Sequence, residues 1–242
     1  MILADTRHHL TRDDAQLAAR ILARESGDEL LSLESKIADE GIDSILDDPR
    51  LPDALRRHPS GIRASFALFA YVMIRHAFRQ AGEHDRGIAD YVASIVIHFG
   101  FHDRSRRISP SDDETYDALV KLCESLDEPD ARRRFLVQTH LGNYALWLSG
   151  VFPDFIERRH WRRGGPDMAY YEELGSRGFQ LAADHRLAEQ NGLAPLYHTA
   201  AERFGLLRTA LNTVSDTLMF PSAHSPERLM RQVRDEARWK LS

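Results

Sequence analysis

The chain has 242 residues, of which 43% are hydrophobic and 29% are charged, a composition typical of globular proteins. Its formal net charge of −5 argues against a protein that wraps nucleic acid, and we expect no nucleic-acid partner. The single cysteine, Cys123, excludes an intramolecular disulfide and a cysteine-rich zinc site.

The N-terminal stretch lacks the apolar run of a signal peptide. The longest uncharged apolar stretch, residues 64–74, is shorter than the roughly 20 residues that a membrane-spanning helix needs. We therefore expect a cytoplasmic protein with no membrane partner.

The first 60 residues predict short helices in an acidic region. Gly27 and Gly41 end two helices, and Pro49, Pro52 and Pro59 interrupt two shorter ones. Because this region carries eight basic and thirteen acidic side chains, it does not fit the phosphate-facing surface of a helix-turn-helix regulator.

Two apolar helices are expected next, over residues 60–81 and 85–100. The first is apolar on nearly all sides between residues 64 and 74, which is typical of a helix buried on most of its surface. Only a few residues join the two helices, so we expect an antiparallel hairpin. A polar loop over residues 101–112 and a helix from about Asp113 to Leu126 follow.

Residues 130–190 hold the richest pattern. Asp130 is expected to cap a helix that ends at Gly150, and Pro153 to begin a helical turn followed by a loop. Asp167 is expected to cap a second long helix, which reaches about Gln190.

Two more helices are predicted, over residues 194–220 and 225–241, the last being amphipathic and opened by Ser225 and Pro226. No strand-like alternation occurs. The prediction is an all-α fold of about nine or ten helices in one bundle-like domain, with residues 1–59 packing on a core of residues 60–242. The last two helices are natural elements of a homodimer.

A short pattern in this stretch resembles one found in uncharacterised bacterial all-helical proteins. It comprises His140-Leu141-Gly142-Asn143-Tyr144, then Phe152-Pro153, then Tyr170-Tyr171-Glu172-Glu173-Leu174-Gly175. The resemblance covers residues 130–180 and implies a helical fold, without an activity.

The same stretch predicts a polar pocket. His140 and Tyr144 share one helix face with Trp147, and Tyr171 and His185 share the next long helix with Gly175 and Gly178. We expect the two faces to meet and, if a ligand pocket lies there, His140, Tyr144, Tyr171 and His185 to line it, with Arg159 and Arg163 at its mouth. The alternative is tight core packing with hydrogen-bonded His and Tyr tips.

Arginine clusters at residues 104–107, 132–134 and 158–163 allow two interpretations. If they converge, they form a site for a phosphate, a carboxylate or an acidic partner. Alternatively, they pair with the acidic runs at residues 111–117 and 124–130.

We therefore expect a non-enzymatic module, without a cofactor, that binds a small anionic ligand or a protein partner. The alternative rests on the pattern His76, His102, Asp103 and a later aspartate such as Asp127, which resembles that of HD-type metal phosphohydrolases. That resemblance implies a divalent metal held by these residues and a metal-activated water that attacks a phosphate ester.

Overall fold

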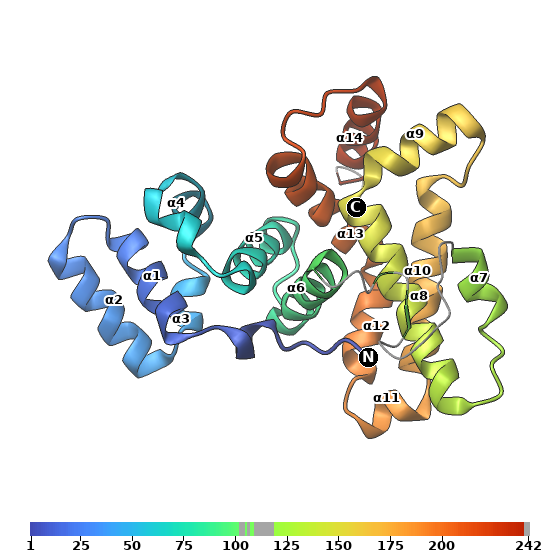
Figure 1. Ribbon diagram of the computed structural model, residues 1–242, viewed down its shortest axis with the longest axis horizontal. Helices are drawn as coiled ribbons and strands as arrows, with labels where there is room; N and C mark the ends of the chain where they lie inside the picture. Colours follow the sequence, from blue (N-terminus) through green and yellow to red (C-terminus); the bar gives the residue numbers. More distant parts are fainter. Residues whose placement is uncertain (102–104, 106, 109–118, 240–242) are drawn as a thin grey trace. The chain divides into compact units, whose positions relative to one another are not determined.

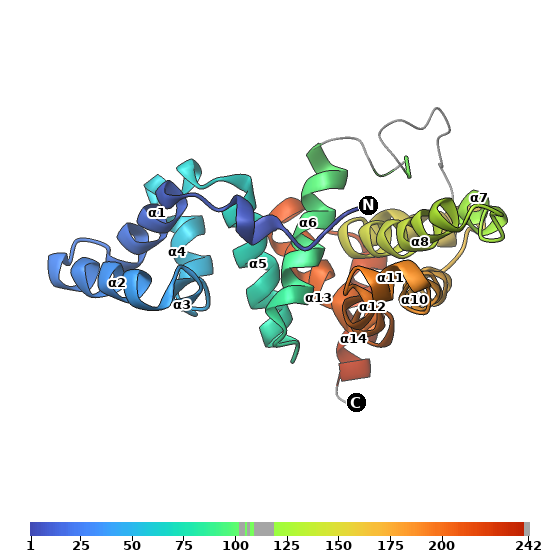
Figure 2. The ribbon, with the colours of Figure 1, turned by 90° about the horizontal axis from the view of Figure 1, so that it is seen from below.

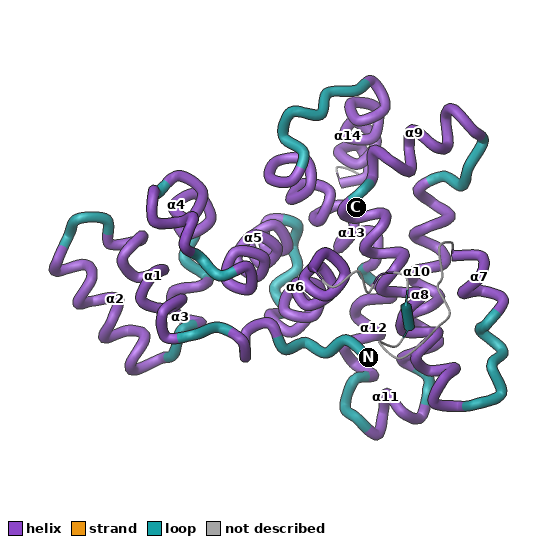
Figure 3. The backbone as a smooth tube through the Cα atoms, viewed as in Figure 1, coloured by secondary structure: helices purple, strands orange, loops and turns teal. Residues whose placement is uncertain are grey.

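A computed structural model describes residues 1–101, 105, 107–108 and 119–239 of the chain. All regular elements in these ranges are helical, and the described residues contain no strand, as Figure 3 shows. The predicted all-α class is therefore confirmed. The described helices are more numerous than the nine or ten expected, because several predicted helices are divided.

The structure divides into two compact units, residues 2–97 and residues 98–242 together with Met1 (Figure 1). The boundary falls within helix α6, Arg86–Phe101, and not near residue 59. How the units combine into domains stays a prediction.

The N-terminal unit is built from six helices and two 3-10 turns. Its α5 begins after Ser65, whose hydroxyl accepts a hydrogen bond from the Leu68 amide, whereas the sequence predicted a start at Ser60. The elements are η1 (Thr6–His9), α1 (Arg12–Ala23), α2 (Gly27–Glu40), α3 (Asp43–Leu46), α4 (Leu51–Arg57), η2 (Pro59–Arg63), α5 (Phe66–Gln80) and most of α6.

Helix α5 supplies much of the core of this unit. Tyr71, Val72 and Phe78 are fully buried, as expected for a helix that is apolar on most sides. One charged side chain, Arg75, is buried with them, and its guanidinium pairs with Asp47 at 2.9 Å. The prediction of a largely buried central helix is confirmed within this unit.

The C-terminal unit contains α7 (Leu119–Glu124), α8 (Ala131–Val151), α9 (Pro153–Arg163), α10 (Met168–Ala183), α11 (Arg186–Gln190), α12 (Ala194–Glu202), α13 (Phe204–Val214), a π-helical turn η4 (Ser215–Met219) and α14 (Pro226–Trp239). Asp130, Asp167 and Ser225 accept hydrogen bonds from backbone amides in the first turns of α8, α10 and α14, as predicted.

Several boundaries differ from the sequence-based expectation. The predicted helix over residues 167–190 breaks at His185, and the one over residues 194–220 breaks at Arg203 and again at the π-helical turn. Residues 158–163, expected in a loop, continue α9 to a total of 11 residues, until Gly164 ends it in the left-handed conformation. Gly150 lies inside α8, where its missing side chain makes room for Leu211.

Helices α8 and α10 lie side by side at very close range (Figures 1 and 2). A Cβ atom added at Gly178 would lie 2.7 Å from the Gly142 backbone nitrogen, and one added at Gly175 would lie 2.9 Å from the Ala145 Cβ. Contact with the backbone of α8 therefore offsets the low helix propensity of these glycines.

No helix in the described part of the chain is both long enough and apolar enough to cross a membrane.

Candidate functional site

Of the residues predicted to line a pocket, His140, Tyr144 and Tyr171 are buried in the C-terminal unit, and His185 is half-buried. The His140 ring lies parallel to that of Tyr144 at 6.0 Å, and its Nε2 donates to the Ser105 carbonyl at 3.0 Å. Tyr171 is buried on α10, where burial raises the pKa of its hydroxyl and Arg159 opposes that rise.

His185 has a structural role at the start of α11. Its Nδ1 accepts a hydrogen bond from the Leu187 amide at 3.2 Å, and its ring packs on Phe135 at 5.1 Å. Burial, followed by Arg134 and Arg186, lowers the pKa of the imidazole. A neutral ring therefore suits this cap.

The prediction that the polar ring face of α8 meets the glycine stripe of α10 is wrong, because a different side of α8 makes this contact. Gly178 approaches Gly142, and Gly175 approaches Ala145, which lie on the side of α8 away from His140 and Tyr144. The tight crossing of α8 and α10 thus uses the small residues of α8 rather than its polar ring face. A ligand-binding role for His140, Tyr144, Tyr171 and His185 stays a prediction.

The arginine clusters differ in their surroundings. In the cluster at residues 132–134, the Arg133 guanidinium lies 3.5 Å from Glu128, and Arg134 donates to the Glu128 carbonyl. This cluster pairs with the acidic run before it, as the second interpretation expected. Residues 104, 106 and 111–117 lie outside the described residues.

The cluster on α9 is different, and we name its members, Arg158, Arg159, Arg162 and Arg163, the α9 arginine face. All four side chains are exposed. Among the residues that the structure describes, none hydrogen-bonds or forms an ion pair with these guanidinium groups. Trp161 lies among them and is 55% exposed.

The opposite side of α9 anchors this face to the unit. Glu157 is buried, accepts a hydrogen bond from the Trp161 indole at 3.3 Å and pairs with Arg234 of α14. Nearby, Arg158 and Arg162 help to lower the pKa of Glu227, after hydrogen bonds from its own amide and from Ser225. The end of α9 is thus held rigidly while its arginines stay in solvent.

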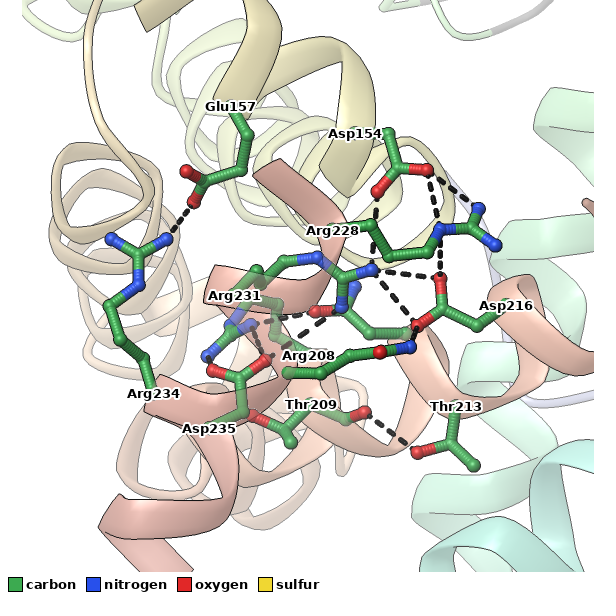
Figure 4. A network of polar contacts seen from close by, with 12 residues as sticks. Asp154, Glu157, Arg208, Thr209, Thr213, Asp216, Arg228, Arg231, Arg234 and Asp235 are labelled. Carbon is green, nitrogen blue, oxygen red and sulfur yellow. Dashed lines mark hydrogen bonds and ion pairs between the residues drawn. The ribbon is translucent and has the colours of Figure 1, made fainter. Parts of the chain in front are cut away.

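The polar network between α9, α13, η4 and α14 lies behind this surface (Figure 4). Arg231 has a nearly inaccessible guanidinium that lies 2.8 Å from Asp216 and 3.2 Å from Asp154. Arg228 lies 2.6 Å from the same Asp154, and Arg208 lies 2.9 Å from Asp235.

This network satisfies its own charges. Arg208, Arg228 and Arg231, which are all buried, each have a carboxylate partner, although the Nε atom of Arg231 has no hydrogen-bond partner among the described residues. The sequence reading missed it, although Arg228, Arg231 and Asp235 recur at helical spacing on α14.

The residues of the metal-hydrolase alternative are only partly described. His76 is buried on α5, where its Nε2 donates to the Leu46 carbonyl at 2.9 Å, and burial lowers the pKa of its ring. His102 and Asp103 lie outside the described residues. Within the described ranges, no group of three His, Cys, Asp or Glu side chains is arranged to hold a metal ion.

The N-terminal unit has an open cavity of about 880 Å³ between α1 and α4. Its arginines are largely neutralised, because Arg50 pairs with Asp48 and Glu29, and Arg57 with Asp53. The cavity therefore has less unpaired positive charge than the α9 arginine face.

No family model matches the sequence, and no curated protein or solved structure is significantly similar to it. The resemblance to uncharacterised bacterial helical proteins stays a prediction, and the physical properties of the site carry the argument about function.

Proposed function

We propose that the protein is a non-enzymatic helical module that binds an anionic ligand or an acidic partner through the α9 arginine face. The observation that carries this proposal is the contrast between paired and unpaired arginines in one unit. Arg208, Arg228 and Arg231 are buried against carboxylates, whereas Arg158 and Arg162 are exposed and have no such partner among the described residues.

The chemistry of this face suits an anion. A guanidinium presents several donors in a fixed plane that matches carboxylate and phosphate oxygens. Four positive charges within six residues reinforce one another, and the exposed Trp161 ring adds an apolar surface beside them. The net charge of −5 makes this a local cationic surface on an acidic chain, which favours a compact anion over a long polyanion.

A charge-reversal variant tests the proposal. Arg158→Glu/Arg162→Glu places two carboxylates on the exposed side of α9 without touching the buried network. The matched control is Arg56→Glu/Arg57→Glu, which reverses two exposed arginines of the N-terminal unit. Calorimetric titration would use two probes, inorganic pyrophosphate and a poly-glutamate peptide, at low and at high salt.

We expect the wild type and the control to bind at least one probe, with an affinity that falls as salt rises. The α9 variant should lose binding at least tenfold, as expected when two charge-assisted contacts are removed. Equal affinity of the α9 variant and the control, or no binding of either probe by the wild type, would refute the proposal.

A further inference from the structure

Helix α14 buries charged side chains and exposes apolar ones, which is the reverse of the usual arrangement in a surface helix. Arg228, Arg231 and Asp235 lie on its inner face within the ion network. On the opposite face are Leu229, Met230 and Val233, which are 64%, 52% and 65% exposed.

This stripe is unfavourable in an isolated chain. Full burial of a leucine, methionine or valine side chain is worth about 1.5–3 kcal/mol, and here most of that stabilisation is unrealised. Arg228 and Arg231 on the inner face form ion pairs with α9 and η4. Because of these pairs, α14 cannot rotate to bury the stripe without separating buried charges. A contiguous apolar stripe held outwards in this way is typical of an interaction surface.

We propose that this stripe is the interface with a second copy of the chain, in which two α14 helices pack antiparallel about a two-fold axis near Met230. A two-fold axis makes the contact self-complementary, so each apolar stripe covers the other. This inference is independent of the α9 arginine face.

The charges beside the stripe favour this occupant. Glu227 and Arg234 lie seven residues apart on the same edge of the helix, one before and one after the apolar residues, and the Arg234 side chain stays 52% exposed although it also pairs with Glu157 of its own chain. In an antiparallel pair centred near Met230, Glu227 of each copy lies opposite Arg234 of the other, which makes two attractive pairs. A parallel pair would instead place the edge of Glu227 against the opposite edge of the partner, which carries Gln232 and Glu236, and would make no such attractive pair.

The same charges argue against an anionic lipid surface. Glu227 is half-buried at one edge of the stripe, and Glu236 is exposed on the other. Amphipathic helices that bind anionic membranes carry lysine and arginine at these edges instead. Because only three apolar side chains form the centre, the contact is smaller than a standard interface of about 800 Å² per partner, and we expect a dimer that dissociates on dilution.

Sedimentation velocity over a wide concentration range tests this interface. The wild type should change from monomer to dimer as its concentration rises. Leu229→Asp/Val233→Asp should stay monomeric throughout and keep the melting temperature of the dilute wild type. Leu31→Asp, which adds a charge at a 66% exposed leucine of α2, is the matched control and should dimerise normally.

Glu227→Arg tests the antiparallel register, because it replaces two attractive pairs with two repulsive ones. We expect its dimer dissociation constant to rise about tenfold. A wild type that is monomeric at every concentration, or a Leu229→Asp/Val233→Asp variant that dimerises equally well, would overturn the interface. An unchanged constant for Glu227→Arg would overturn the register.

A lipid partner gives a different result. If the monomeric wild type sediments with phosphatidylserine vesicles and Leu229→Asp/Val233→Asp does not, the stripe binds a membrane surface, and the proposed dimer is wrong. Loss of vesicle binding in the α9 variant alone would bear on the arginine face and leave the dimer unaffected.

Discussion

Helices α5 and α14 are of nearly equal length, 15 and 14 residues, but they bury opposite kinds of side chain. Within the N-terminal unit, α5 buries Tyr71, Val72 and Phe78 together with a single arginine. Within the C-terminal unit, α14 buries Arg228 and Arg231 and leaves Leu229, Met230 and Val233 mostly in solvent.

The difference shows that the neighbours of a helix, more than its own pattern, decide which face is buried. The inner face of α14 meets Asp154 of α9 and Asp216 of η4, whose carboxylates provide hydrogen-bonding partners for guanidinium groups. A buried arginine is tolerated where such partners exist. Leu229, Met230 and Val233 of α14 are then mostly exposed in this unit, and we propose that a second copy covers them.

Truncation of an apolar side chain should change the free energy of unfolding much more in α5 than in α14, and this is the largest difference that we expect between the two helices. Phe78→Ala in α5 removes a fully buried ring and should reduce the free energy of unfolding by about 3–5 kcal/mol. Leu229→Ala in α14 should change it by less than about 0.5 kcal/mol in dilute solution. Urea denaturation of both variants measures this, and a large loss for Leu229→Ala would mean that the stripe is covered within the monomer.

Removal of a buried arginine should have nearly as large an effect. Arg231→Met removes one of the two guanidinium groups that Asp154 and Asp216 share, the other being Arg228, and should cost about 3 kcal/mol or more. The control Arg158→Met removes an exposed guanidinium of α9 and should stay within about 0.5 kcal/mol of the wild type. If both variants melt alike, the network does not stabilise the unit.

The ion pair of the one buried arginine of α5 should contribute less to the free energy of unfolding, and its contribution should depend on pH. Burial by itself raises the pKa of Asp47, but hydrogen bonds from Arg75 and Arg86 outweigh it and lower the pKa to about 2. Because the folded-state pKa lies below the ordinary value of 3.8 for an aspartate, this carboxylate stabilises the fold above about pH 4, and the contribution is lost as the pH falls towards 2.

Asp47→Asn isolates that contribution. Between about pH 5 and pH 2 the wild type should lose about 2 kcal/mol more of its free energy of unfolding than the variant does. Denaturation curves at several pH values measure the difference. Parallel pH profiles for the two proteins would show that the pairing with Arg75 does not stabilise the N-terminal unit.

Much of the helical fold could be predicted from local signals. Asp130, Asp167 and Ser225 were identified as caps because their side chains precede helical runs, and their hydrogen bonds confirm this. Gly150 was misread as a terminator, because local sequence does not reveal that Leu211, more than 60 residues away along the chain, packs against it.

The site was less accessible to sequence reasoning. The four arginines of α9 were visible as a cluster, but their placement on a helix depended on residues 158–163 continuing the helix begun at Pro153. The burial of arginines and the exposure of apolar side chains on α14 could not be predicted, because the cause lies in carboxylates of other elements, such as Asp154 and Asp216. The crossing of α8 and α10 was assigned to the wrong face because periodicity fixes a stripe but not its partner.

The claim that α14 exposes its apolar face in the monomer is tested most directly by the rate at which an introduced thiol reacts. In a Cys123→Ser background, Val233→Cys places a thiol on the outer face of α14, and Val72→Cys places one in the buried face of α5. We expect Val233→Cys to react in dilute solution at nearly the rate of an unfolded chain and more slowly as concentration rises, whereas Val72→Cys reacts only on unfolding. Protection of Val233→Cys in dilute solution would contradict the account.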